Sequence, residues 1–209
     1  MKVAGGVLVI LISILSARYV LDYGPTLKYK DRKLSTFFQN HLRLIEDDVE
    51  RLAIGDVSVR ANIMRPTNRG LLSDKEFEIA YYNSEEDYDE EEFELTFKEN
   101  QGVVGSTYAT GTESIAVSQD QLSGWEDGWE TTATQDRVTS HLETIIGIPV
   151  YRPSDDERED DPTAVLIVDS ENSLAEFIEN PGEPLDDEFK NSELADELTT
   201  HASNVGILL

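Results

Sequence analysis

The chain of 209 residues contains no cysteine, and its basic residues are scarce. Without cysteine, disulfide bonds, thiolate metal sites and cysteine nucleophiles are excluded. Only 17 Lys and Arg stand against 43 Asp and Glu, which gives a formal net charge of −26. After Lys33 the imbalance is sharper, with 11 cations against 41 anions. Because nucleic-acid binding needs clustered cations that displace counterions, we expect no nucleic-acid partner.

Recognisable catalytic and metal-binding patterns are missing as well. His41, His141 and His201 are widely separated and lack the spacing of metal ligands, so we interpret them as surface or interface residues. No serine lies in a nucleophile elbow. Among 43 acidic residues, paired carboxylates say almost nothing about acid–base catalysis. The sequence therefore predicts no enzymatic activity, no catalytic residues and no metal site, and it leaves any cofactor unknown.

The acidic composition is itself informative. Self-repulsion of such a surface is weakest where salt screening is strong. A folded domain of this charge therefore resembles haloarchaeal, salt-adapted proteins. The alternative is an acidic disordered chain, which requires apolar segments too sparse to pack. The apolar segments along this chain, and its hydrophobic content of 39%, favour the folded, halophilic interpretation.

The N-terminus carries a charge-free apolar run, VAGGVLVILISILS, over residues 3–16. With its continuation to residue 21 it would form a helix about 28 Å long, close to the roughly 30 Å of a hydrocarbon core. We therefore predict a transmembrane anchor at residues 1–21. The alternative is a cleaved signal peptide, because Lys2 followed by 14 apolar residues also fits that pattern. Against it, Leu15-Ser16-Ala17 is a poor cleavage site.

The scarce cations gather on the C-terminal side of this segment. They are Arg18, Lys28, Lys30, Arg32 and Lys33. The positive-inside rule then places the following chain in the cytoplasm. We predict a single-pass protein of the cell membrane, with a juxtamembrane linker at 22–33 and a cytoplasmic domain at 34–209.

Hydrophobic periodicity predicts strands framed by helices in this domain. The expected strands are 57–64, 77–82, 94–97, 114–117, 145–151 and 163–169, and the expected helices are 34–53, 101–110, 173–180 and 185–209. Pro149 suggests an edge or a bulge. The acidic run 84–94 is interpreted as a solvated loop. A calcium site there is an alternative, but the EF-hand spacing is absent. Residues 119–140 are polar and are predicted to be irregular. Strands framed by helices are typical of an α+β domain with an antiparallel sheet.

Four stretches, in this order, resemble a GAF domain. Residues 59–64 with the following strand are similar to its first hairpin, and Gln101-Gly-Val-Val-Gly-Ser-Thr-Tyr108 to its G-x-x-G helix start. Residues 142–150 are similar to its "S-x-x-x-x-P-I" strand and residues 164–170 to its "G-V-L-x-x-x-S" strand. The resemblance implies a central antiparallel sheet with a ligand pocket on one face and helices on the other. It also implies a sensory role or simple dimerisation.

The resemblance narrows the possible functions. Bilin-attaching and methionine-sulfoxide-reducing members need cysteines, which this chain lacks. No kinase, cyclase or helix-turn-helix signature is present, so a signalling output would belong to a separate protein. By analogy, residues 117–131 cover the pocket, where Trp125 and Trp129 would stack on a flat ligand. The alternative is that both rings close over the sheet without a ligand. Further candidate ligand-binding residues are Arg60, as a cation, and Tyr81, Thr107 and Tyr108.

The helices at 34–53 and 185–209 both carry apolar stripes. In GAF proteins such flanking helices often pair between subunits, so the resemblance implies a homodimer. The alternative is that both helices only pack on their own sheet. The predicted function is a membrane-anchored GAF-type sensory or regulatory module that binds a small molecule and signals through these helices. The second hypothesis is a ligand-free dimerisation or protein-interaction module at the membrane.

Overall fold

The computed structural model describes residues 34–52, 57–67, 75–118, 129–153, 161–174 and 185–209. The chain divides into two units, residues 1–37 and 38–209, and the whole sheet belongs to the second. The predicted anchor and linker, Trp125 and nearly all of the predicted helix 173–180 lie outside the described residues. Within the described part of the chain, no helix has the length and apolar character needed to cross a membrane.

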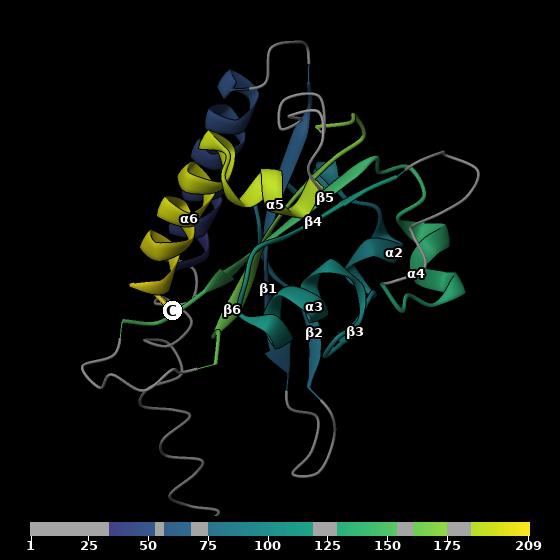
Figure 1. The fold of residues 1–209 in the computed structure, drawn as a ribbon. Helices are drawn as coiled ribbons and strands as arrows, with labels where there is room; N and C mark the ends of the chain where they lie inside the picture. The colour runs from purple at the N-terminus through teal and green to yellow at the C-terminus, as the bar shows by residue number, and fades with distance from the viewer. Residues whose placement is uncertain (1–33, 53–56, 68–74, 119–128, 154–160, 175–184) are drawn as a thin grey trace, which may run out of the picture. The chain divides into compact units, whose positions relative to one another are not determined.

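Six antiparallel strands form a single sheet in the order β3-β2-β1-β6-β5-β4 (Figure 1). The central strand β6 is buried at every position, which explains why its sequence, AVLIVDS, is almost continuously apolar. The strands are β1 (Val59–Thr67), β2 (Glu76–Tyr82), β3 (Phe97–Lys98), β4 (Ser114–Val117), β5 (Thr144–Val150) and β6 (Ala164–Ser170).

Helices cover both faces of the sheet (Figure 1). Residues 38–52 of the first helix and α6 lie side by side on one face, and α3 packs on the other, against β5 and β6. The helices are the one over residues 34–52, α2 (Glu90–Phe93), α3 (Gly102–Thr110), α4 (Ala133–Val138), α5 (Leu185–Lys190) and α6 (Glu193–Gly206), with a 3₁₀ turn η1 at Glu85–Asp87. The predicted α+β class with an antiparallel sheet flanked by helices is confirmed.

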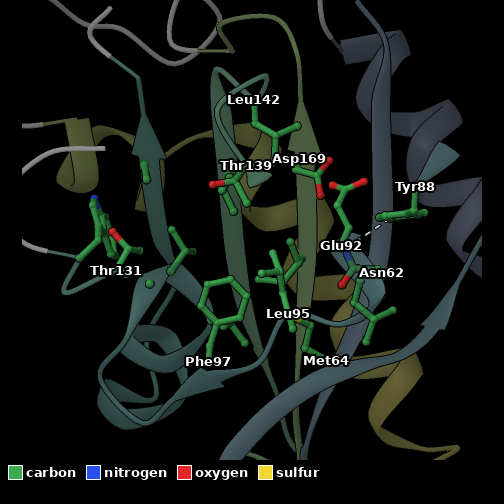
Figure 2. A pocket seen from close by; sticks show the side chains of 18 residues that line it. Asn62, Met64, Tyr88, Glu92, Leu95, Phe97, Thr131, Thr139, Leu142 and Asp169 are labelled. Carbon is green, nitrogen blue, oxygen red and sulfur yellow. Dashed lines mark hydrogen bonds between the residues drawn. The ribbon is translucent and has the colours of Figure 1, made fainter. Parts of the chain in front are cut away.

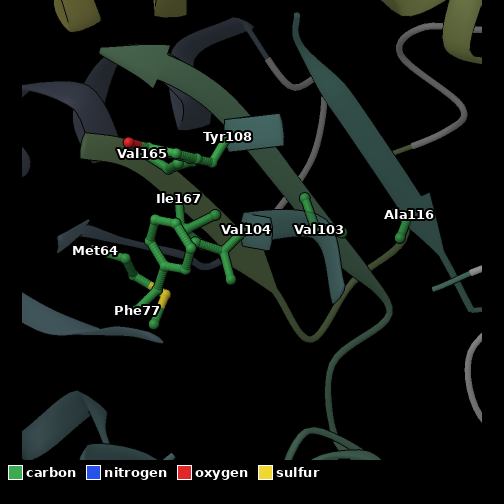
Figure 3. Packing of buried hydrophobic residues seen from close by; sticks show 8 residues of the cluster. All are labelled: Met64, Phe77, Val103, Val104, Tyr108, Ala116, Val165 and Ile167. Atoms are coloured by element: carbon green, nitrogen blue, oxygen red, sulfur yellow. The ribbon is translucent and has the colours of Figure 1, made fainter. Parts of the chain in front are cut away.

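A hydrophobic cluster fills the space between the sheet and α3 (Figure 3). Phe77 and Tyr108 pack with their rings tilted by 57° and their centroids 4.7 Å apart. The cluster joins β1, β2, β4 and β6 to the helix and consists of Met64, Phe77, Val103, Val104, Tyr108, Ala116, Val165 and Ile167. This packing holds α3 firmly against the sheet.

The two glycines of the G-x-x-G pattern shape the start of α3. Gly102 adopts a φ of +61°, which a residue with a side chain rarely adopts. A Cβ at Gly105 would collide with the backbone carbonyl of Lys98. The pattern therefore allows a sharp turn out of β3 and a close approach between the helix and that strand.

A β-bulge in β2 decides which side chains reach each face of the sheet. Ile63 pairs with Tyr81 but Met64 pairs with Ile79, so Ala80 is the extra residue. Ile79 consequently lies on the α3 side with Met64. Tyr81 lies on the opposite side, where its ring stacks on Phe38 with centroids 4.2 Å apart.

Two predicted elements are shorter than expected. The strand predicted at 94–97 is reduced to Phe97–Lys98, because the chain before it turns through α2. The helix predicted at 185–209 is two helices. Ser192 breaks it by capping a new helix, since its hydroxyl accepts a hydrogen bond from the Ala195 amide at 3.1 Å.

Two regions predicted to lack structure contain helices. In the predicted irregular region 119–140, the structure describes residues 129–140, and these include α4. A capping box between Thr132 and Gln135 starts this helix. The acidic run 84–94 contains η1 and α2 and is not a purely solvated loop.

Pro149 lies in β5, whose neighbours in the sheet are β4 and β6. The pairing between β4 and β5 stops at Gly147, so Pro149 has no partner residue on β4. Its missing amide hydrogen therefore costs no sheet hydrogen bond.

Candidate functional site

The sheet face that carries α3 also holds a cavity of about 70 Å³ (Figure 2). Most of its wall is apolar, contributed by the strands, by α3 and by the segments that precede α3 and α4. Apolar lining residues include Met64, Ile79, Leu95, Phe97, Val103, Val104, Leu142, Ile145 and Ile167. The cavity is far smaller than the roughly 300–1,000 Å³ of a drug-sized pocket. It exceeds the roughly 10–15 Å³ that one water needs.

Polar side chains line part of this wall. Asn62 on β1 and Asp169 on β6 point from the sheet, while Tyr88 and Glu92 come from the acidic segment around α2 (Figure 2). Asn62 Nδ2 donates to the Tyr88 hydroxyl at 3.4 Å. Asn62 Oδ1 is buried and has no hydrogen-bond partner among the described residues. A buried amide with one unused polar atom is costly unless something in the cavity completes it.

Arg60 lies next to this polar group and is held by two carboxylates. Its Nε is 2.6 Å from Asp169 Oδ1, and its two terminal nitrogens lie 2.9 and 3.2 Å from the Glu92 oxygens. The Asp87 carbonyl takes a further hydrogen bond at 2.6 Å, and the guanidinium lies 4.4 Å from the Tyr88 ring centroid. Because these partners use most of its donors, Arg60 is a structural cation, already neutralised within the protein.

Burial and charge shift the titration of this cluster. Burial alone would lower the pKa of Arg60, but Asp169 and Glu92 outweigh it and the net shift is upward. Burial raises the pKa of Asp169, and Glu92 adds to that rise while Arg60 opposes it. Burial also raises the pKa of the Tyr88 hydroxyl well above its usual value. Tyr88 therefore stays a neutral donor and acceptor at neutral pH.

Of the residues predicted to bind a ligand, Trp129 lines the cavity, whereas the two candidates on α3 do not. Trp129 lines the cavity, and its carbonyl accepts a 2.6 Å hydrogen bond from the Gly102 amide. Thr107 and Tyr108 are buried in α3 but pack on Gly147 and Phe77, outside the cavity lining.

Two further candidates lie away from the cavity wall. Arg60 stands behind Glu92 and Asp169. Tyr81 lies on the opposite face of the sheet, because of the bulge. Trp125 is outside the described residues. The structure thus brings Arg60 and Trp129 to the neighbourhood of the cavity and leaves the α3 pair and Tyr81 elsewhere.

Sequence reasoning missed the polar part of the wall: Asn62, Tyr88, Glu92 and Asp169. Glu92 was hidden in a run of acidic residues that we interpreted as solvated, whereas it is 6% exposed. The aromatic Tyr88 within that run was the available signal, because a large ring amid charges marks a segment that folds back on the core. Asp169, at the end of the most apolar strand, was a second signal of a buried carboxylate.

No protein-family model matches the chain, and no curated protein matches it. Among solved structures it is similar to the GAF domain region of a proposed membrane protein from Geobacter sulfurreducens. The two share 10% identity over 88% of this chain and 97% of the other, with a TM-score of 0.53. The fold is that of a GAF domain.

Two weaker similarities are to a further GAF domain and to a nitrate-binding protein. The GAF domain of a two-component sensor histidine kinase from Bacillus halodurans shares 15% identity over 79% of this chain and 93% of that one, with a TM-score of 0.42. NreA from Staphylococcus aureus, mutated in its nitrate-binding site, shares 11% identity over 69% and 87%, with a TM-score of 0.40. At such identities the likeness concerns the fold alone.

Proposed function

We propose that this protein is a GAF-type sensory or regulatory module that binds a small molecule in the cavity beneath α3. One observation carries the proposal: a mostly apolar cavity presents the buried, unpaired Asn62 amide oxygen. Apolar walls with a few convergent polar groups are the usual make-up of a ligand site. The partly buried Trp129 in the same wall supplies an aromatic surface.

The wall defines the chemistry of the ligand. A cavity of about 70 Å³ admits a molecule of only a few heavy atoms. The amide of Asn62 offers one unused hydrogen-bonding atom whichever way it is turned, so the ligand carries a matching polar group. Two carboxylates face one guanidinium beside the cavity, which disfavours an anion. The proposed ligand is a small, uncharged, mainly apolar molecule with one polar end.

Strand β1 is the proposed route from the cavity to the flanking helices. Asn62 and Met64 line the cavity, while Ala61 is tied to the helix over residues 34–52 through its amide, which donates to Glu46 Oε1 at 3.0 Å. A shift of β1 on ligand binding would therefore move that helix. In this proposal the N-terminal segment anchors the protein in the cell membrane, with the domain in the cytoplasm and a separate protein as output.

The alternative is a ligand-free module whose role is homodimerisation or protein interaction at the membrane. Its supporting observation is a pair of exposed apolar side chains, one on the helix over residues 34–52 and one at the C-terminal cap of α6. Leu44 is 55% exposed and Ile207 is 68% exposed. Such residues would be covered in a dimer built through these helices. Analytical ultracentrifugation of the full chain in detergent and molar KCl tests the homodimer, and a monomer would overturn homodimerisation.

The ligand proposal is tested by mass spectrometry of small molecules released from the denatured protein after purification in molar KCl. Ala116 lines the cavity, so Ala116→Leu should fill it and reduce ligand occupancy at least about tenfold, comparable to 1.4 kcal/mol of binding. The matched control is Ala133→Leu on the exposed surface of α4, which should keep full occupancy. Unfolding curves verify that both variants fold. Equal occupancy in all three proteins, or no small molecule in any, would contradict the proposal.

A further inference from the structure

On the sheet face opposite the cavity, three potential metal ligands converge between two helices. Asp48 comes from the helix over residues 34–52, and Glu197 and His201 come one turn apart on α6. These two helices lie side by side in Figure 1. One ligand atom from each of the three side chains lies within 4.8 Å of the other two.

The imidazole nitrogen His201 Nε2 is the centre of the group. It lies 3.1 Å from Asp48 Oδ2 and 3.8 Å from Glu197 Oε1. Two carboxylates therefore approach the same imidazole nitrogen, and the other oxygen of Asp48 is paired with Arg51 at 3.1 Å. His201 is only 8% exposed, and the ring of His41 packs against it with centroids 5.2 Å apart. Its Nδ1 is also buried without a hydrogen-bond partner among the described residues.

The spacing of these atoms fits a divalent transition metal. In tetrahedral zinc sites with metal–ligand bonds of about 2.0–2.1 Å, neighbouring ligand atoms lie about 3.3 Å apart. The two distances from His201 Nε2 are within half an ångström of that value, and small side-chain rotations would bring the two carboxylates to it. A cation at the centre would also replace one shared proton with two positive charges.

We propose that Asp48, Glu197 and His201 form a binding site for a divalent transition-metal ion of the zinc class, which clamps the two terminal helices together. Asp48 and Glu197 side chains are 31% and 40% exposed, which leaves a path for the ion and room for water to complete the coordination. The imidazole favours zinc over magnesium or calcium, which prefer oxygen ligands alone. Because His201 Nδ1 lacks the second-shell partner that strengthens most metal sites, we expect micromolar affinity.

The test is isothermal titration of the full, chelator-treated chain with zinc, in molar KCl and an excess of Mg²⁺. The Mg²⁺ occupies the many carboxylate-only positions of this acidic surface, so a remaining one-to-one isotherm reports a site that contains the imidazole. We expect this isotherm for the wild type. His201→Gln should weaken it at least about tenfold, since even loss of a second-shell partner commonly costs 10–100-fold.

Three variants separate a specific site from loss of fold. Asp48→Asn and Glu197→Gln remove the other ligands at half-buried positions and should each weaken zinc binding, while His141→Gln, which removes an imidazole outside the group, should not. Zinc should raise the unfolding midpoint of the wild type and of His141→Gln only. The proposal is overturned if no one-to-one isotherm survives the Mg²⁺, or if folded His201→Gln binds zinc as tightly as the wild type.

Discussion

Arg60 and Asp169 are direct cross-strand partners on β1 and β6, and their side chains meet at 2.6 Å. Glu92, on α2, completes the cluster from outside the sheet at 2.9 Å. This ion triad joins the central strands to the acidic segment that lines the cavity. Through Arg60, the acidic segment around α2 is held against the sheet although it carries many negative charges.

Replacing Arg60 with methionine should destabilise the protein by about 3–5 kcal/mol, because two buried carboxylates lose their cation. The measurement is urea unfolding in molar KCl. Arg137→Met is the matched control, since its ion pair with Glu91 is exposed on both sides and should contribute less than about 1 kcal/mol. Adding Glu92→Gln and Asp169→Asn to Arg60→Met should restore part of the loss. Similar losses for the two arginine variants would contradict this account.

Gly147→Ala should cost about 1–3 kcal/mol through overpacking between β5 and α3. A Cβ there would collide with Thr107 Oγ1 and lie 2.9 Å from Val103 Cγ1. The second variant, Thr107→Ala in the Gly147→Ala background, removes the colliding hydroxyl and should recover part of the stability. A double-mutant cycle from thermal unfolding measures this coupling, and strictly additive effects would show that the two residues do not touch in solution.

The stability of the protein should fall as the pH rises from about 5 to about 7, in part through Glu46. Burial raises the pKa of this carboxyl to about 7, with Asp87 adding to the rise, while hydrogen bonds from Ala61 and Asn83 oppose it. At a pH between the unfolded and the folded pKa of Glu46, the native state binds a proton that the unfolded state has released. The free energy of unfolding therefore falls as the pH rises through this window, and the contribution of Glu46 no longer changes above it.

Glu46→Gln removes this titration. Relative to the wild type, the variant should gain about 2–3 kcal/mol between about pH 5 and about pH 8. Chemical unfolding of both proteins at several pH values gives the difference directly. A difference between variant and wild type that does not change with pH would contradict a raised pKa at Glu46.

The unfolding midpoint should rise strongly with salt, because a net charge of −26 repels itself when screening is weak. Between about 0.1 M and about 3 M KCl we expect a gain of about 3 kcal/mol, or about 6–12 °C in Tm. Circular dichroism melts measure it, and choline chloride should reproduce the early part of the rise because screening depends on ionic strength. A midpoint independent of salt would contradict the halophilic interpretation.

Much of the fold could be predicted from the sequence because its strands are local patterns. The alternation in β1 and the apolar run of β6 each express burial on one or both faces, and five of the six strands occur where periodicity placed them, whereas β3 overlaps its predicted range 94–97 only at Phe97. Helix boundaries that depend on a single capping side chain, such as Ser192, were harder to predict. The apolar stripe continues across Ser192 and indicated one uninterrupted helix. The bulge at Ala80 was invisible, and it sent Tyr81 to the face opposite the cavity.

The surface chemistry and the order of the elements can be derived without the structure, because the acidic charge, the lack of cysteine and the strand–helix pattern follow from composition and short-range periodicity. Which polar groups meet depends on the folded arrangement. Arg60 reaches Asp169 across 109 residues, and Asp48 reaches His201 across 153. Such pairs depend on strand register and helix packing, which sum many weak contacts over the whole domain and leave no mark in any local stretch of sequence.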